Sequence, residues 1–265
     1  MTSMSRLTGS LLALCFACSS FFSPSALAIT GKEADAKLAK MVADITTTQQ
    51  DTDDYEKLQS LNDEMLKYLK TVAVQPAVMS DPLKAAVKNG LSVLTSDDKK
   101  IRCYSWDTLT GGTMHFFYSL IAYDAGNNKL KTLVLNPTGE EGDPGSTFED
   151  LDTVKTSDGK TVYLVRDLFI GSGMSHGRTI SAYVIANGKL TKYPFFQTKK
   201  RILNAITFAF GEYDERACFE LSKDKMTLKV PLIKEPPEDS PSSGIVTGKY
   251  LTYSFNGSKY VYQTK

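Results

Sequence analysis

The hydrophobic period of the chain changes near residue 99, and this change limits the fold more than any other feature. From residue 31 to about 95, apolar residues recur every three or four positions, as on one face of a helix. From residue 99 onward the period is two, and short segments rich in Val, Ile, Thr, Tyr and Phe alternate with turn residues. We therefore expect an α+β protein, with a helical segment (29–97) before an antiparallel β-rich domain (98–265).

Three helices are expected in the first part. The face of the first carries Leu38, Met41, Val42 and Ile45, and that of the second carries Tyr55, Leu58, Leu61, Met65, Leu66, Leu69 and Val72. Asp53, with Glu56 three residues later, resembles a cap for the second helix, and Pro76 should end it. A third helix is predicted to start at Ser80 or Asp81 and to bury Leu83, Ala86, Val87, Leu91 and Leu94.

The second part indicates strands joined by tight hairpins. The clearest strand segments are 161–165, 179–185, 206–210, 226–230 and 250–255. Turn sequences such as Asp158-Gly159 and Asn187-Gly188 suit hairpins because both central residues tolerate positive φ. Their recurrence is compatible with a propeller-like repeat or a long meander, and equally with a curved sheet, a sandwich or a partial barrel. Segments 136–150 and 234–244, rich in Pro, Gly and Ser, are predicted to be exposed loops.

The first 28 residues predict a secretory signal peptide. Arg6 precedes a short apolar run, 11–18, and the segment ends in Ala26-Leu27-Ala28. The run is too short to span a bilayer, so we expect cleavage after Ala28, no transmembrane segment in the mature protein, and a periplasmic or secreted location.

The charge balance disfavours two classes of partner. The chain has 31 Lys and Arg residues and 30 Asp and Glu residues. Removal of the signal peptide takes away Arg6, so the two numbers become equal. A nearly neutral chain lacks the concentrated basic surface that nucleic acid or an anionic membrane requires. The expected partner is a ligand or protein of the cell envelope or exterior.

Two cysteines remain after signal removal, Cys103 and Cys218. In an oxidising compartment such a pair is able to form one disulfide, and the alternative is two buried free thiols. No group of Cys and His residues has the short spacing of a zinc site, so we expect no metal and no cofactor.

The densest unusual stretch runs from Cys103 to Phe117. It holds the only Trp, Trp106, and one of two His residues, His115. A hairpin would bring them together, and Tyr104, Trp106, Asp107 and His115 then form a candidate site for a sugar or aromatic ligand. The alternative is that Trp106 anchors the core and His115 makes a structural hydrogen bond.

The run Tyr104-Ser105-Trp106-Asp107, followed by Gly111-Gly112-Thr113-Met114-His115, resembles a motif of uncharacterised secreted bacterial proteins. Segments 187–190, 248–250 and 253–257 are similar as well. The resemblance covers the chain from about residue 99 and leaves the helical part unmatched. It implies an exported bacterial protein and no particular activity.

Gly173-Met174-Ser175-His176-Gly177 matches the Gly-x-Ser-x-Gly pattern of esterases. The residues that follow alternate like a strand and not a helix, and no His occurs after His176 to act as the base. We therefore expect a non-enzymatic module that binds a ligand or protein. The alternative is a secreted or periplasmic hydrolase that uses Ser175 with His176 or His115.

Overall fold

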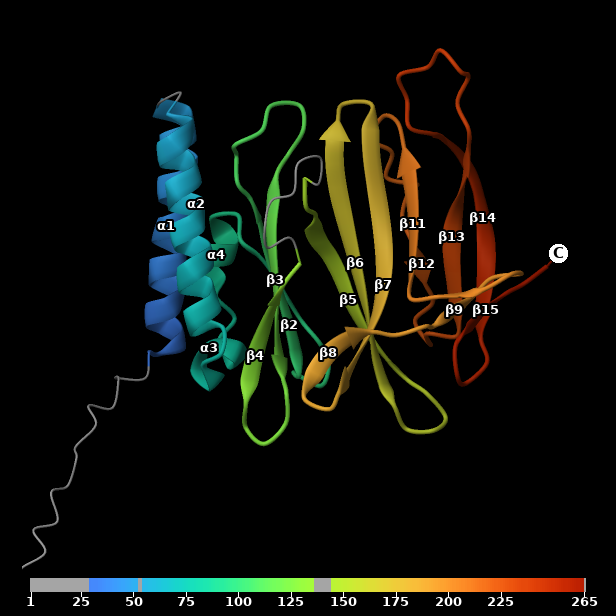
Figure 1. Ribbon diagram of the computed structural model, residues 1–265, viewed down its shortest axis with the longest axis horizontal. Coiled ribbons are helices and arrows are strands. Elements are labelled where there is room, and N and C mark those ends of the chain that lie inside the picture. The colour runs from blue at the N-terminus through green and yellow to red at the C-terminus, as the bar shows by residue number, and fades with distance from the viewer. Residues whose placement is uncertain (1–28, 52–53, 136–143, 265) are drawn as a thin grey trace, which may run out of the picture.

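The computed structural model describes residues 29–51, 54–135 and 144–264, so the predicted signal peptide lies outside the described residues. The described chain forms four stacked layers, one of helices and three of β-sheet (Figure 1). Strands make up 42% and helices 22%, and the sheets are antiparallel with one exception, which confirms the α+β class.

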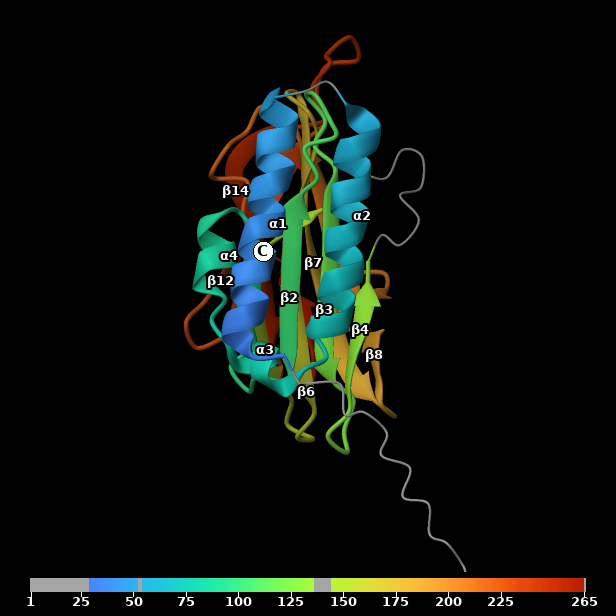
Figure 2. The same cartoon turned by 90° about the vertical axis from the view of Figure 1, so that its left-hand side faces the viewer.

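The helical layer covers the outer face of the first sheet. It contains α1 (Gly31–Asp51), α2 (Tyr55–Val72), α3 (Pro76–Ser80) and α4 (Lys84–Lys88). α1 and α2 lie side by side over that sheet (Figure 2). The Asp54 side chain caps α2 by accepting a hydrogen bond from the Lys57 backbone N–H (2.9 Å). The expected cap, Asp53, lies outside the described residues. None of the described helices combines the length and apolar character needed to cross a membrane.

The third helix that we expected from Ser80 or Asp81 onward is confirmed only over α4, because α3 ends at Ser80 and a strand takes up the residues after α4. α4 begins only after Leu83, which has a left-handed backbone (φ 49°). Asp35 on α1 accepts hydrogen bonds from the first backbone N–H groups of α4, those of Ala85 (3.1 Å) and Ala86 (2.8 Å). The residues that follow pair in the first sheet as β1 (Ser92–Thr95). Pairing in the sheet overrides the local helical spacing of these apolar residues.

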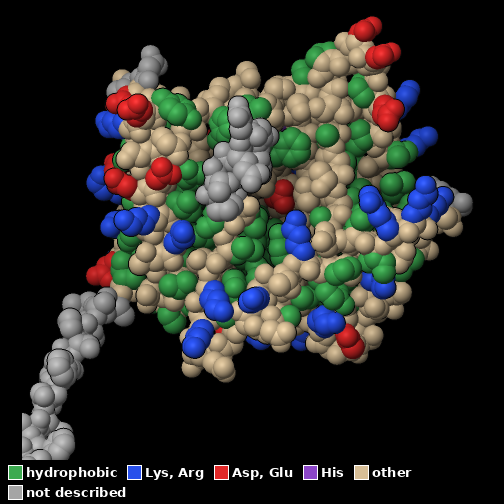
Figure 3. All heavy atoms as spheres, in the orientation of Figure 1, with side chains coloured by type: hydrophobic (Ala, Val, Ile, Leu, Met, Phe, Trp, Pro, Cys, Tyr) green, Lys and Arg blue, Asp and Glu red, His purple; other side chains and the backbone are tan. Residues whose placement is uncertain are grey.

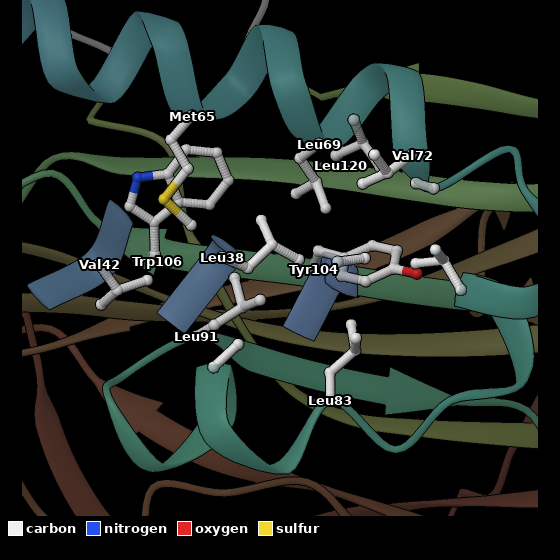
Figure 4. Close-up of a cluster of buried hydrophobic side chains, with 14 of the residues drawn as sticks. Leu38, Val42, Met65, Leu69, Val72, Leu83, Leu91, Tyr104, Trp106 and Leu120 are labelled. Atoms are coloured by element: carbon white, nitrogen blue, oxygen red, sulfur yellow. The ribbon is translucent and has the colours of Figure 1, made fainter. Parts of the chain in front are cut away.

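The first sheet is buried on both faces. It runs in the order β1, β2 (Ile101–Asp107), β3 (Phe117–Asp124) and β4 (Leu130–Val134). In β2, Tyr104 and Trp106 pack under the helices, whereas Ile101 and Cys103 face the second sheet. Figure 4 shows Met65 of α2 over Trp106 in the helix-covered core. Burial of both faces explains why β2 is almost continuously buried instead of alternating.

The second sheet is the central layer of the β part. Its strands are β5 (Thr147–Lys155), β6 (Thr161–Ser172), β7 (Ser175–Ala186), β8 (Lys189–Lys192) and β11 (Ala205–Phe210). Their order is β11-β7-β6-β5, and β8 also pairs with β7. Strands predicted at 161–165, 179–185 and 206–210 are confirmed. The predicted turn at Asn187 and Gly188 has positive φ at both residues (51° and 68°).

One loop prediction is wrong at its end. We expected a loop over 136–150, but residues from Thr147 onward pair with β6 as β5. Residues 136–143 lie outside the described part of the chain. The predicted loop at 234–244 is confirmed, because β13 ends at Lys234 and β14 begins at Ile245.

The third sheet closes the stack. Its strands are β9 (Phe196–Gln197), β10 (Ile202–Leu203), β12 (Glu220–Leu221), β13 (Thr227–Lys234), β14 (Ile245–Phe255) and β15 (Tyr260–Tyr262), in the order β10-β9-β15-β14-β13-β12. Among the described strands, only β15 and β9 pair in parallel. Its aromatic rings, such as Phe195 and Tyr260 with centroids 5.5 Å apart, share one core with Val162 and Leu164 of β6 in the second sheet. The sheets stack face to face, so a propeller-like arrangement is wrong.

Candidate functional site

Two of the predicted ligand-binding residues lie in the core. Trp106 is 2% exposed, and its Nε1–H donates a hydrogen bond to Asn62 Oδ1 (2.9 Å). The Tyr118 ring meets the Trp106 ring edge to face at 5.5 Å between centroids. Tyr104 is completely buried on the same side of β2. In this structure the helices cover both rings, so neither offers a face to a ligand.

The structure brings Asp107 and His115 together, whereas the hairpin interpretation predicted that Trp106 and His115 would meet. Their contact is 2.5 Å between His115 Nδ1 and Asp107 Oδ2. Asp107 also accepts a hydrogen bond from the Leu109 backbone N–H (2.9 Å), and the His115 ring stacks on Phe117 at 6.1 Å. Alternation along β2 places Asp107 on the face opposite Trp106. The predicted four-residue site is therefore divided between two faces of the first sheet.

The Gly-x-Ser-x-Gly sequence forms a β-hairpin. Ser175 begins β7 and pairs with Ser172 at the end of β6, so no helix follows it. Its Oγ accepts a hydrogen bond from Ser243 Oγ (2.6 Å). His176 points to the opposite face, where Nδ1 bonds to the Gly211 carbonyl (2.8 Å). This geometry provides no serine–histidine pair of the kind that activates a nucleophile.

Of the two alternatives for the cysteine pair, the structure has the free thiols, with no disulfide between Cys103 and Cys218. Cys103 is fully buried between the first and second sheets. Cys218 lies between β11 and β12, close to the charge of Arg178, which projects toward the third sheet. The second sheet thus separates the two thiols. Burial raises the pKa of both.

Sequence reasoning missed a cleft of about 520 Å³ between the first and second sheets. Its wall carries the hydroxyl groups of Ser119, Ser146, Thr179, Ser181 and Tyr183, together with the charged groups of Asp167 and Lys192. Figure 3 shows this face of the molecule, which is hollowed near its centre and holds a recessed acidic side chain. The cleft thus combines a polar wall with two groups of opposite charge.

Among the described residues, Asp167 provides the one carboxyl group of this wall. Burial raises its pKa to about 7, and the charge of Glu149 adds to this rise. A hydrogen bond with the Ser146 hydroxyl and the charge of Lys192 act in the opposite direction. Among the described residues, no Lys or Arg nitrogen lies within 4.0 Å of the Asp167 carboxylate. A largely buried carboxyl group without an ion-pair partner, facing a cleft, is typical of a functional site.

The position of Asp167 follows from β6, where two charged residues interrupt an apolar run. Arg166 faces the third sheet and donates hydrogen bonds to Asp150 and Asp152 (the latter at 2.8 Å). Asp167, the next residue, therefore faces the first sheet, and its pairing partner in β7 is Thr179. The only sequence signal was this pair of adjacent charges directly after the predicted strand 161–165.

The described residues contain no group of three or more His, Cys, Asp or Glu side chains able to hold a metal ion. No family model, no curated protein and no solved structure matches the chain.

Proposed function

We propose that the protein is an exported, non-enzymatic binding module that holds a small polar ligand in the cleft between the first and second sheets. The observation that carries the proposal is Asp167, a largely buried carboxyl group that faces the cleft without a cation at ion-pair distance. A buried charge of this kind is costly unless a partner satisfies it. A ligand that supplies hydrogen-bond donors to Asp167 removes that cost.

The size and chemistry of the cleft agree with a small polar ligand. Its volume of about 520 Å³ falls in the range of small-molecule sites. Apolar side chains such as Leu135 and Phe169 contribute part of the wall, and the five hydroxyl groups are able to donate and accept hydrogen bonds. The hydrolase alternative requires Ser175 with His176 or His115. Ser175 and His176 face away from each other, and the His115 ring bonds to Asp107 (2.5 Å).

Ligand binding is expected to depend on Asp167. We would screen monosaccharides, amino acids and small amines at millimolar concentration against labelled protein, and follow the backbone amide signals of Ser146, Thr179 and Ser181 by NMR. At least one compound should shift these signals. Asp167→Asn should weaken its binding by about tenfold or more, because hydrogen bonds to a charged group contribute about 1.5–3 kcal/mol.

Asp239→Asn is the matched control for this experiment, because it makes the same chemical change at an exposed turn. It should bind the compound as the unaltered protein does. The proposal fails when no compound in the screen shifts the cleft amides, or when Asp167→Asn binds as tightly as the unaltered protein.

Export is supported by the order of charge, apolar run and small residues in 1–28. Expressed with this segment in a bacterial host, the protein should be recovered from the periplasm or medium with Ile29 as its first residue, as measured by intact mass. Leu12→Arg, which places a charge in the apolar run, should leave the chain uncleaved in the cytosol. Full-length protein in the cytosol without this change would contradict export.

A further inference from the structure

The cleft carries one negative and one positive group that do not form an ion pair. Asp167 and Lys192 are the charged side chains among the described residues that line it. Their nitrogen and oxygen atoms are more than 4.0 Å apart, yet the charge of Lys192 still acts on Asp167. A gap therefore separates two opposite charges along one wall.

Strand register defines this gap. Asp167 on β6 pairs with Thr179 on β7, whereas Lys192 on β8 pairs with Tyr183 on β7. Thr179, Ser181 and Tyr183 share one face because residues alternate along a strand. Lys192 thus lies on the far side of β7 from Asp167 and four residues further along. With about 3.3 Å per residue and about 4.8 Å between strands, only the length of the Lys192 side chain brings the charges near each other.

Two ion pairs among the described residues lie on the neighbouring strands β5, β6 and β7. Arg178 donates hydrogen bonds to both carboxylate oxygens of Glu149 (2.7 and 2.8 Å), and Arg166 bonds to Asp152 (2.8 Å). None of these side chains lines the cleft, so none is placed to satisfy Asp167 there. A ligand then meets a wall with one charge of each sign.

We propose that the ligand is a zwitterion of amino-acid type, with its ammonium group at Asp167 and its carboxylate at Lys192, because these two groups face the same cleft across a gap lined by hydroxyl groups. This inference rests on the function proposed above and names its ligand class. A simple amine leaves Lys192 without a partner and places two cations in one cleft. A simple carboxylate at Lys192 leaves Asp167 without a partner and places two anions in one cleft. A zwitterion satisfies both ends.

The chain length of the ligand is open to direct measurement. Glycine, β-alanine, γ-aminobutyrate and 5-aminovalerate separate the two charges by increasing distances. n-Butylamine and butyrate each retain one end. Calorimetry and amide NMR on the mature protein should show that one zwitterion of the series binds at least about tenfold more tightly than n-butylamine or butyrate, since each lost charged hydrogen bond costs about 1.5–3 kcal/mol.

Two variants separate the two ends. Lys192→Gln should reduce zwitterion binding to that of the corresponding amine, and Asp167→Asn should reduce it to that of the corresponding acid. Lys189→Gln is the matched control, because Lys189 is an exposed lysine of the same strand that faces the opposite side. It should bind the zwitterion as the unaltered protein does.

The outcomes distinguish this inference from the proposed function. When a monosaccharide, the uncharged probe, binds in an Asp167-dependent manner and no zwitterion does, the binding module stands and the zwitterion is overturned. When the amine binds as tightly as the zwitterion and Lys192→Gln has no effect, the zwitterion is again overturned. When no compound shifts the cleft amides, both fail.

Discussion

Replacing Asp167 with asparagine is expected to stabilise the protein at pH 8 by about 2–4 kcal/mol and to change its stability little at pH 4. Burial raises the pKa of Asp167 in the folded protein to about 7, from an ordinary value of 3.8. Between about pH 4 and pH 7 the folded state retains a proton that the unfolded state has lost. The free energy of unfolding therefore falls as pH rises through this window, by at most about 1.4 kcal/mol per pH unit. Above pH 7 it no longer changes with pH.

The free energy of unfolding in urea, measured from pH 4 to pH 8, checks this result. Trp106, the only tryptophan, provides the fluorescence signal because it is buried between the helices and the first sheet. The exposed control Asp239→Asn should follow the pH profile of the unaltered protein. An Asp167→Asn profile with the same slope between pH 5 and pH 7 would contradict the raised pKa.

This prediction also bears on function. A residue that lowers stability at neutral pH, and whose replacement raises it, is typical of a binding site in which stability is exchanged for activity. Asp167→Asn is expected to do both, by gaining stability and losing the ligand. A structural role for Asp167 would instead lead to a loss of stability.

Removing Glu149 is expected to destabilise the protein by about 3 kcal/mol, because it leaves a buried cation without its counter-charge. Arg178 has a side chain that is only 5% exposed, and Glu149 binds its Nε and one terminal nitrogen. The guanidinium also lies 5.5 and 5.6 Å from the ring centroids of Phe210 and Tyr213 and donates a hydrogen bond to the Ala217 carbonyl (2.5 Å). It thereby holds β5, β7 and the segment after β11 together.

Urea unfolding of Glu149→Ala measures this loss. The matched control is Asp44→Ala, which removes the partner of Lys40 in an exposed ion pair on α1, with side chains 41% and 74% exposed. It should change stability by no more than about 0.5 kcal/mol. The double variant Glu149→Leu with Arg178→Met should recover part of the loss, because no uncompensated charge remains. Equal effects of Glu149→Ala and Asp44→Ala would contradict the assigned role of this ion pair.

The predictions that succeeded concern short stretches of chain. The apolar spacing of α2 identified the helix because one face repeats every three or four residues whatever it packs against. The turn at Asn187 and Gly188 was visible because two residues with positive φ favour few other conformations. The change of period near residue 99 separated helices from most strands, and only β1 precedes it.

The prediction that failed, and the alternatives that the sequence left open, depended on partners distant in sequence. The segment Ser92–Thr95 is a strand because β2 pairs with it, although its spacing is compatible with a helix. Trp106 belongs to the core because Asn62, 44 residues earlier, accepts its hydrogen bond. Cys103 and Cys218 remain free because the second sheet lies between them. In each case the sequence indicated a noteworthy residue or segment but did not determine what surrounds it in the fold.

The sequence by itself determined where most helices, strands and tight turns form, since these depend mainly on neighbours within a few residues. Only the tertiary structure decided which strand faces meet, and with them the cleft that contains Asp167. Its wall comes from β3, β6, β7 and β8, and alternation along each strand sends adjacent residues into different layers. The pleat of β6 sends Asp167 toward the cleft and Arg166 toward the third sheet. No local sequence pattern specifies which layer lies on which side of β6.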